Sequence, residues 1–417
     1  MKRLIVRPNG PLRGSVPIGG SKNAALPILA ATLLCEEPCI IGNLPLIRDV
    51  ERMLTILIHM GCTVQRLDRA TCRIDPRGAC PSASPDKLTE ELRASSYLLG
   101  AGLGRFGEGR IGRIGGCDFG GRPIDQHIKA FAALGASVCL SEEEVSVRAP
   151  ALTGATVDFD TVSVGATVNA MLAAVRAKGE TVLFHAASEP HILDLARFLN
   201  RCGADIRGAG TGVIRIRGVS CLKGCSYGIV PDMIEAGTYL LAAAATRGAV
   251  TARGIPPEQL RPLTEKLKQM GADVDCEENA VTVFAASTLR AVSLTTRPYP
   301  GFPTDLQPQM VAALTVAEGV GTVRETVWQK RFRYVEELCK MGATVRVFDN
   351  RATVVGGSLT GATVNVPDLR AGAALLIAAC AAEGESVLEN AEPITRGYED
   401  LLYKMEGLGA SVTALDQ

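Results

Sequence analysis

A cysteine within a glycine-dense segment is the clearest candidate for a reactive group. Cys117 lies in GRIGRIGGCDFGGRP, which ends at residue 123. Glycine adopts positive φ easily but loses much entropy on ordering, so we expect a mobile or tightly turned loop. Arg110, Arg113 and Arg122 would favour the thiolate of an exposed Cys117, as in a lid that carries a chemical group. An unreactive surface cysteine on a flexible turn is an equally open interpretation.

Charged and capping residues also gather where buried helices are expected to begin. Six Ala-rich stretches are apolar on nearly all sides and are therefore predicted to be buried helices. The free N–H groups and positive dipole of a helix N-terminus favour anions, so several such ends facing one cleft would bind a multiply charged anionic substrate. Ser163 and Asp232 can equally be simple caps, whereas Lys and Arg are poor in that role. The residues at or just before these starts are Lys22, Arg93, Ser163, Asp232, Asp305 and Asp368 to Arg370.

The other motifs indicate neither a cofactor nor a metal. GLGRFG, residues 102–107, matches a dinucleotide-binding pattern but follows a buried helix instead of a strand. The 13 cysteines include no C-x-x-C pair, and the four histidines lack metal-ligand spacing. His127, at the start of an amphipathic helix, is predicted to be structural. No G-x-S-x-G elbow or Walker loop occurs, so we predict no cofactor and no metal site.

The elements that position these residues form a sixfold internal repeat. An amphipathic helix leads each time to a glycine followed by a short β-branched strand, which suits a left-handed helix cap. The spacings between these glycines are 74, 68, 68, 71 and 67 residues, and the buried helices interleave with them. Three units in each of two closed domains fit the length better than a solenoid, whose units are usually shorter. The repeat glycines are Gly61, Gly135, Gly203, Gly271, Gly342 and Gly409.

Length and composition limit the number of domains, the kinds of partner and the location that we expect for the protein. With 417 residues, two domains of about 200 residues are the default expectation. Lys plus Arg equals Asp plus Glu, at 44 each, and no basic stripe is visible, so we predict no nucleic-acid partner. The longest uncharged apolar run, residues 371–382, is too short to span a bilayer. The N-terminus lacks a signal-peptide pattern and the thiols fit a reducing compartment, so we expect a cytoplasmic protein without a membrane partner.

Four phrases together resemble the UDP-N-acetylglucosamine enolpyruvyl transferases, also called UDP-N-acetylglucosamine 1-carboxyvinyltransferases. They are SKNAALPILAA (21–31), GGCDFGGRPID (115–125), FPTDLQPQ (302–309) and DLRAGAAL with TRGYE (368–375 and 395–399). The resemblance spans the chain and implies an α/β fold, the two-domain inside-out α/β barrel with three βαβαββ repeats per domain. It implies one domain at 22–230 and another at 1–21 plus 231–417, with the active site in the cleft between them.

The resemblance also implies the reaction and its residues. The sugar 3′-hydroxyl attacks C2 of phosphoenolpyruvate while C3 is protonated, and the resulting phospho-ketal expels phosphate, in the first committed step of peptidoglycan synthesis. Asp305 is the implied base and Cys117 the proton donor, which the antibiotic fosfomycin would alkylate, with Lys22 and Arg396 completing the catalytic set. The implied phosphoenolpyruvate contacts are Lys22, Asn23, Arg122, Arg331, Arg370 and Arg396. The implied nucleotide-sugar contacts are Asn23, Arg93, Arg122, Pro123, Ile124, Asp125, Gln126, Thr161, Val162, Ser163, Val164, Asp305 and Val327.

Some positions depart from the family pattern. Thr161 stands where Lys is common and Gln126 where Leu is common, while Gln329–Lys330 and Thr395 replace Glu-Asn and Asp. Thr161 removes an expected diphosphate contact, which bears on substrate affinity more than on the reaction.

Two other functions stay open: an idle or regulatory paralogue that binds nucleotide sugar, and 5-enolpyruvylshikimate-3-phosphate synthase, a family without the cysteine-bearing lid. Protein partners are not predicted.

Overall fold

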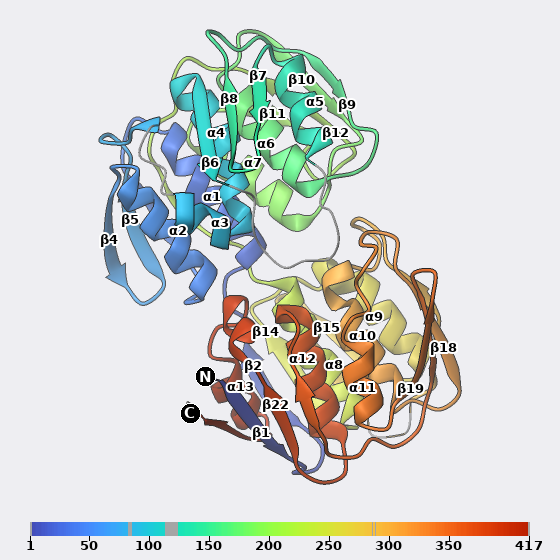
Figure 1. Cartoon of the computed structure of the whole chain (residues 1–417). Helices are drawn as coiled ribbons and strands as arrows, with labels where there is room; N and C mark the ends of the chain where they lie inside the picture. Colours follow the sequence, from blue (N-terminus) through green and yellow to red (C-terminus); the bar gives the residue numbers. More distant parts are fainter. Residues whose placement is uncertain (1, 82–85, 113–123, 286, 288, 416–417) are drawn as a thin grey trace. The chain divides into compact units, whose positions relative to one another are not determined.

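The computed structural model describes residues 2–81, 86–112, 124–285, 287 and 289–415. The chain divides into two units, each with its own hydrophobic core. Unit 2 is continuous from Gly20 to Val230, whereas unit 1 combines Met1–Gly19 with Pro231–Gln417. The chain therefore begins in one unit, builds the other and returns (Figure 1). The first crossing falls between Gly19 and Gly20, slightly before the position 22 implied by the resemblance.

The repeat glycines end helices as predicted. All six have positive φ, between 87° at Gly342 and 104° at Gly203, a region that side chains with a Cβ rarely adopt. A strand begins two residues after each of them, at positions 63, 137, 205, 273, 344 and 411. The sixfold pattern of amphipathic helix, left-handed glycine and strand is thus confirmed.

The helices alternate between buried and amphipathic members. Unit 2 contains α1 (Lys22–Ala31), α2 (Arg48–His59), α3 (Asp86–Glu91), α4 (Tyr97–Phe106), α5 (Asp125–Ala133), α6 (Val164–Ala174) and α7 (Pro190–Arg201). Unit 1 contains α8 (Met233–Ala245), α9 (Pro257–Met270), α10 (Gln307–Leu314), α11 (Val335–Lys340), α12 (Leu369–Ala381) and α13 (Leu401–Gly407). Short 3-10 helices are η1 (Thr32–Leu34), η3 (Arg93–Ser96), η4 (Thr304–Leu306) and η5 (Glu392–Arg396).

The described strands form six small sheets, of which five have four strands and are mixed, and one, β6-β8-β7, has three antiparallel strands. In unit 2 the sheet orders are β13-β3-β5-β4, β6-β8-β7 and β11-β12-β10-β9. These strands are β3 (Cys39–Gly42), β4 (Thr63–Asp68), β5 (Thr71–Asp75), β6 (Glu108–Gly112), β7 (Ser137–Leu140), β8 (Glu144–Arg148), β9 (Thr156–Asp158), β10 (Glu180–Phe184), β11 (Asp205–Arg207), β12 (Val213–Arg217) and β13 (Ser226–Gly228). The four-stranded sheets share one pattern, a parallel edge pair followed by two antiparallel pairs, as in β13–β3, β3–β5 and β5–β4.

Unit 1 has sheets of the same kind, and one of them joins the two ends of the chain. The orders are β21-β22-β1-β23, β15-β16-β14-β2 and β17-β18-β20-β19. These strands are β1 (Arg3–Arg7), β2 (Arg13–Pro17), β14 (Ala249–Arg253), β15 (Asp273–Glu277), β16 (Ala280–Phe284), β17 (Leu294–Thr295), β18 (Val320–Arg324), β19 (Thr344–Phe348), β20 (Arg351–Val355), β21 (Thr363–Asn365), β22 (Ser386–Glu389) and β23 (Ser411–Leu415). β1 pairs with both β22 and β23.

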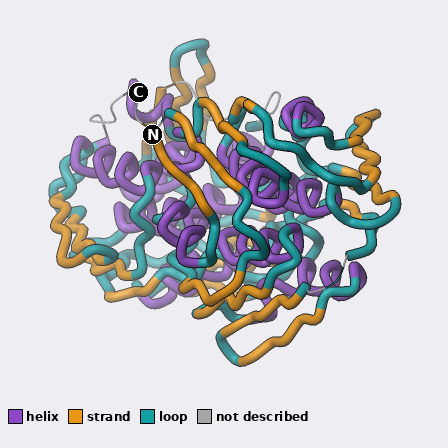
Figure 2. The backbone as a smooth tube through the Cα atoms, turned by 90° about the horizontal axis from the view of Figure 1, so that it is seen from below, coloured by secondary structure: helices purple, strands orange, loops and turns teal. Residues whose placement is uncertain are grey.

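The Ala-rich helices α1, α4 and α6 occupy the centre of unit 2, and α8, α10 and α12 that of unit 1. Figure 2 shows helices in the interior and strands mainly toward the outside, with further helices also at the outer edge. The interior position fits the nearly complete burial of α6 and α12, because a helix that is apolar all round must be covered on every side. Gly100 of α4 illustrates how small residues permit this packing: its N–H donates to Asn169 Oδ1 of α6 at 2.9 Å. A Cβ at Gly100 would lie 2.5 Å from the Asn169 carbonyl oxygen, so a larger residue would push the helices apart. Within the described residues, no helix combines the length and apolar character needed to cross a membrane.

Candidate active site

Asp305 of unit 1 lies between two buried arginines. It stands in η4, immediately before α10. Arg331 Nη2 lies 3.1 Å from Asp305 Oδ1, and Arg370 donates to Oδ2 from Nε (3.2 Å) and Nη2 (3.0 Å). The side chain of Asp305 is 28% exposed, whereas those of Arg331 and Arg370 are 2% and 4% exposed. The two buried cations therefore hold the carboxylate in one orientation and leave part of it accessible.

Arg370 is held at the start of α12 by several partners. Asp368 caps this helix by accepting from the backbone N–H groups of Arg370 and Ala371 at 2.9 and 3.1 Å. The Arg370 guanidinium carbon lies 5.4 Å from the centroid of the Tyr398 ring. Burial opposes its charge, but the Asp305 carboxylate and the Tyr398 oxygen outweigh burial and raise the pKa of Arg370. Its Nη1 atom is buried without a hydrogen-bond partner among the described residues, so a donor remains for an anionic ligand.

Tyr398 links Arg370 to the other central helices of unit 1. Its hydroxyl group lies 3.0 Å from Thr238 Oγ1 of α8 and accepts from Gln309 Nε2 of α10 at 3.1 Å. Arg396, implied to bind phosphoenolpyruvate, ends η5 two residues before Tyr398 and is half-buried. η5 packs against α12, the helix that carries Arg370 near its start.

Glu325 organises the two segments that carry Asp305 and Val327. This buried side chain, 2% exposed, follows β18. It accepts hydrogen bonds from Thr304 Oγ1 (3.0 Å), Thr296 Oγ1 (2.8 Å) and the backbone N–H of Val327 (2.7 Å). Sequence reasoning missed Glu325, because a single acid after a strand does not reveal that it satisfies donors from three segments.

Lys22 of unit 2 is paired with a buried carboxylate. It is the first residue of α1, and its Nζ lies 2.7 Å from Asp49 Oδ2 in the first turn of α2. Both side chains are largely buried, at 13% and 3% exposed. Asp49 compensates a cation that is unfavourable at a helix N-terminus, and the sequence offered no signal for this pairing. Asn23, the next residue, is half-buried.

Gln126 connects the start of α5 to the segment before α6. Its Nε2 donates to Asp160 Oδ2 at 3.0 Å, and its Oε1 accepts from the Asp160 backbone N–H at 2.9 Å. Nε2 also donates to Asp125 Oδ2 at 2.9 Å. This bonding fixes the segment that begins with the exposed Thr161. The departure at position 126 is thus accommodated by a polar contact that the sequence did not predict.

The residues that follow lead into α6. Val162 is 40% exposed, and Ser163 Oγ accepts from the backbone N–H of Ala166 at 3.3 Å. Val164 is the first residue of the helix. Asp232 caps α8 in the same manner, accepting from the backbone of Ile234 at 2.7 Å. The cap interpretation therefore applies to Ser163 and Asp232, which the sequence had left undecided.

Arg93 begins η3, and its positive charge acts on the pKa of the buried His127. His127 of α5 is 5% exposed, and a Cβ on Gly165 of α6 would lie 2.7 Å from its Nε2. Burial, and secondarily the charge of Arg93, lower the pKa of His127 to about 4. His127 is therefore a neutral packing residue between α5 and α6, consistent with the structural role predicted for it.

This shift predicts acid sensitivity. The unfolded chain protonates His127 near pH 6.5 and the folded chain only near pH 4, so stability is lost as pH falls through this window. The loss should reach about 3 kcal/mol for this group, at about 1.4 kcal/mol per pKa unit. Urea unfolding of His127→Leu at several pH values should show a correspondingly weaker pH dependence than the unsubstituted protein. His59→Gln, at an exposed histidine, is the control; equal pH dependence in all three would contradict this assignment.

Three predicted residues, Cys117, Arg122 and Pro123, lie outside the described residues. The flanking positions are described: Gly112 ends β6, and Ile124 and Asp125 lead into α5.

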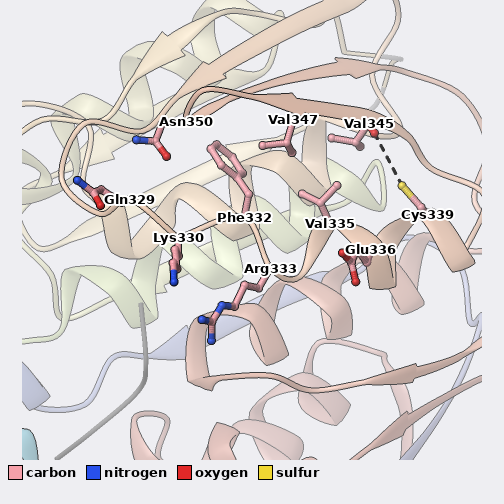
Figure 3. A pocket seen from close by; sticks show the side chains of 10 residues that line it. All are labelled: Gln329, Lys330, Phe332, Arg333, Val335, Glu336, Cys339, Val345, Val347 and Asn350. Atoms are coloured by element: carbon pink, nitrogen blue, oxygen red, sulfur yellow. Dashed lines mark hydrogen bonds between the residues drawn. The ribbon is translucent and has the colours of Figure 1, made fainter. Parts of the chain in front are cut away.

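A surface hollow of unit 1 contains none of the candidate catalytic residues. It has a volume of about 680 Å³. Figure 3 shows Lys330 and Arg333 on one side of Phe332 and the valines Val345 and Val347 on the other. The departures at positions 329 and 330 therefore line this hollow. Its lining residues are Gln329, Lys330, Phe332, Arg333, Val335, Glu336, Cys339, Val345, Val347 and Asn350.

Comparison with known proteins defines the class. Residues 6–405 match the family model described as EPSP synthase (3-phosphoshikimate 1-carboxyvinyltransferase). The chain belongs to this family, and is thus an enzyme of the enolpyruvyl (1-carboxyvinyl) transferase class. The α/β fold and the resemblance derived from the four sequence phrases are confirmed.

Within this class, the chain is similar over nearly its whole length to proteins named UDP-N-acetylglucosamine 1-carboxyvinyltransferase. UDP-N-acetylglucosamine 1-carboxyvinyltransferase 2 of Clostridium acetobutylicum is 47% identical, and UDP-N-acetylglucosamine 1-carboxyvinyltransferase 3 of Caldanaerobacter subterraneus subsp. tengcongensis is 46% identical, each over 99% of both chains. The enolpyruvyl transferase NikO from Streptomyces tendae superposes with a TM-score of 0.90 at 27% identity, over 99% of this chain and 98% of that one. An EPSP synthase from Acinetobacter baumannii has a TM-score of 0.78 at 19% identity, over 99% and 100% of the two chains, and shares the fold.

Proposed function

We propose that this chain transfers the enolpyruvyl group of phosphoenolpyruvate to the 3′-hydroxyl of UDP-N-acetylglucosamine and releases phosphate. The proposal rests mainly on the 44–47% identity, along nearly the whole chain, to relatives that carry this activity in their names. The solved EPSP synthases are only 18–19% identical to it. Shikimate-3-phosphate is therefore the less favoured acceptor.

In this proposal Asp305 accepts the proton of the sugar hydroxyl. As that proton leaves, the hydroxyl oxygen bonds to C2 of phosphoenolpyruvate and C3 takes up a proton, which gives the phospho-ketal. The C2–O bond to phosphate then breaks, and C3 loses a proton to restore the double bond. The partial exposure of Asp305 supports this role, because a base must reach its substrate. The buried Arg331 and Arg370 hold the carboxylate in one orientation.

Cations would bind the phosphate and carboxylate groups of phosphoenolpyruvate. We propose Lys22, Arg122, Arg370 and Arg396 for this contact, with Arg331 and Asn23 beside them. A set of preorganised cations stabilises charge as it develops on the departing phosphate. The buried Nη1 donor of Arg370 supports its part in this set. Lys22 and Asn23 belong to unit 2 and Arg331, Arg370 and Arg396 to unit 1, so we further propose that both units contribute residues to substrate binding.

Cys117 is proposed to protonate C3 and to be able to form a thioether adduct with the enolpyruvyl carbon. The proposal rests on the GGCDFGGRP motif and its neighbouring arginines. The nucleotide sugar would contact Arg93, the segments 122–126 and 161–164, Asp305 and Val327. The hydrogen bonds of Gln126 to Asp160 support a preformed nucleotide-sugar segment, although Thr161 supplies no cation for the diphosphate.

The biological role follows from this activity. We propose that the enzyme works in the cytoplasm, in the first committed step of peptidoglycan synthesis. It would thereby serve cell-wall biogenesis, cell shape, the cell cycle and cell division. Fosfomycin, which mimics phosphoenolpyruvate, is proposed to inactivate it.

Phosphate release from phosphoenolpyruvate tests the proposal. We expect release with UDP-N-acetylglucosamine and none above background with shikimate-3-phosphate. Release with shikimate-3-phosphate alone would reassign the acceptor. Release with neither, together with tight binding of the nucleotide sugar by calorimetry, would indicate a catalytically idle paralogue and overturn the proposed activity.

A further inference from the structure

Four cysteines of unit 2 come together although they are far apart in the sequence. Cys35 follows η1 and Cys39 begins β3, whereas Cys202 follows α7 and Cys225 precedes β13. The Ile40 backbone N–H donates to the Cys225 carbonyl at 2.9 Å, since β3 and β13 are parallel neighbours. The first and third repeats of unit 2 therefore meet at these cysteines. All four thiols are free of disulfide bonds.

The sulfur atoms have the spacing of a metal-binding cluster. Those of Cys35, Cys39 and Cys202 all lie within 4.8 Å of one another. The sulfur of Cys225 lies 3.4 Å from that of Cys202. Four thiolates around Zn²⁺ at the usual Zn–S length of about 2.3 Å form a tetrahedron with edges of about 3.8 Å. Small side-chain adjustments would bring the sulfurs of Cys35, Cys39 and Cys202 to that spacing, and the Cys225 side chain, outside the 4.8 Å group, would have to turn toward them to complete the tetrahedron. A covalent S–S bond would require about 2.0 Å.

Burial and composition favour a structural metal site. Cys35 and Cys39 are fully buried and Cys202 is 1% exposed, whereas Cys225 is partly exposed. Four sulfurs fill a tetrahedral zinc shell and leave no position for a substrate. Cys225 provides the accessible edge through which a metal ion can enter. Among the described residues, Cys35, Cys39 and Cys202 are the one group of three or more His, Cys, Asp or Glu side chains with ligand atoms close enough to hold a metal ion, and Cys225 lies beside this group through its contact with Cys202.

We propose that Cys35, Cys39, Cys202 and Cys225 together bind one structural Zn²⁺ ion. The ion would tie the segment after α1 to the end of α7 and to β13, and so close the ring of three repeats in unit 2. Closing a chain segment of this length removes much entropy from the unfolded state. The spacing Cys35-x-x-x-Cys39 falls within the C-x₂₋₄-C range of zinc sites. The sequence prediction considered only C-x-x-C pairs and therefore found no metal site.

Metal analysis of the full-length protein tests this site. Protein from zinc-supplemented cells, freed of loosely held metal by gel filtration, should contain about one zinc ion per chain. Cys202→Ser should lower this content roughly tenfold or more, because one ligand of a closed shell is lost. Cys72→Ser is the matched control, as Cys72 is equally buried in the same unit but lies in β5. A zinc content near zero in the unsubstituted protein, or equal contents in both variants, would overturn the proposal.

Cobalt substitution tests whether four thiolates bind the metal ion, even if Cys202→Ser fails to fold. Co²⁺ in the unsubstituted protein should give a thiolate-to-cobalt charge-transfer band in the near ultraviolet and strong visible bands typical of tetrahedral coordination. Removing the metal with a chelator should lower Tm by about 5 °C or more, since a bound ligand stabilises the folded state. Weak, octahedral-type cobalt bands would contradict a tetrathiolate site. So would recovery of a Cys202–Cys225 disulfide from freshly purified, metal-free protein.

Discussion

Replacing Asp305 by asparagine should lower kcat about a thousandfold, the scale of a lost general base. Asparagine keeps the shape, but its single amide oxygen can accept from only one of the two arginines that now donate to opposite carboxylate oxygens. It also cannot take the proton of the attacking hydroxyl. Since both guanidinium groups are buried, the loss of the carboxylate charge should also reduce stability. Steady-state phosphate release measures the first effect and thermal unfolding the second.

Asp232→Asn is a suitable control for Asp305→Asn. Asp232 is also an acid at the start of a central helix of unit 1, but it acts as the cap of α8. Asparagine caps helices as well as aspartate does, so kcat should stay within about twofold. If Asp305→Asn retained turnover within about threefold of the unsubstituted enzyme, Asp305 would be neither base nor positioning residue.

The second large effect concerns Cys117. Fosfomycin should inactivate the enzyme irreversibly, because a thiolate opens the epoxide: a C–S bond forms, a C–O bond breaks and the oxygen takes up a proton. Cys117→Ser should be insensitive to the drug and lose about a hundredfold in kcat, as expected for a weakened proton donor. Intact mass spectrometry should show one adduct on the unsubstituted protein and none on Cys117→Ser.

Thiol labelling compares the reactivity of Cys117 with that of the other cysteines. Cys276 is exposed, so Cys276→Ser serves as the control and should stay fully sensitive to fosfomycin. One fast-reacting thiol at position 117, protected by substrates, is expected in the unsubstituted enzyme. Equal, slow labelling of all exposed thiols, with full activity after long exposure to the drug, would argue that Cys117 is an ordinary surface cysteine.

The fold could be predicted largely from repetition. Each repeat glycine has a positive φ that only the glycine backbone adopts cheaply, so the pattern of helix, glycine and strand was visible six times. Helices that are apolar all round had to be buried, as the residues of α6 and α12 illustrate. Local sequence patterns are sufficient for such features because each depends on residues close together in the chain.

The site was predictable in its residue types but not in its contacts. Asp305, Arg331 and Arg370 were each identified, yet their mutual ion pairs join positions far apart in the chain. The supporting roles of Glu325 and Asp49 arise only from burial beside specific donors, which spacing does not encode. The same holds for the thiol cluster, where the pairing of β13 with β3 brings the segment of Cys225 beside that of Cys39, while Cys202 comes from the end of α7.

The reaction run in deuterium oxide tests the central claim most directly. Protonation of C3 from solvent-exchanged groups, followed by elimination, should place deuterium in the vinyl group of the product. We predict a UDP-N-acetylglucosamine enolpyruvyl ether with a partly deuterated vinyl group, formed together with an equal amount of phosphate, detected by proton and phosphorus NMR. Unchanged UDP-N-acetylglucosamine and phosphoenolpyruvate after prolonged incubation with folded enzyme would contradict the account.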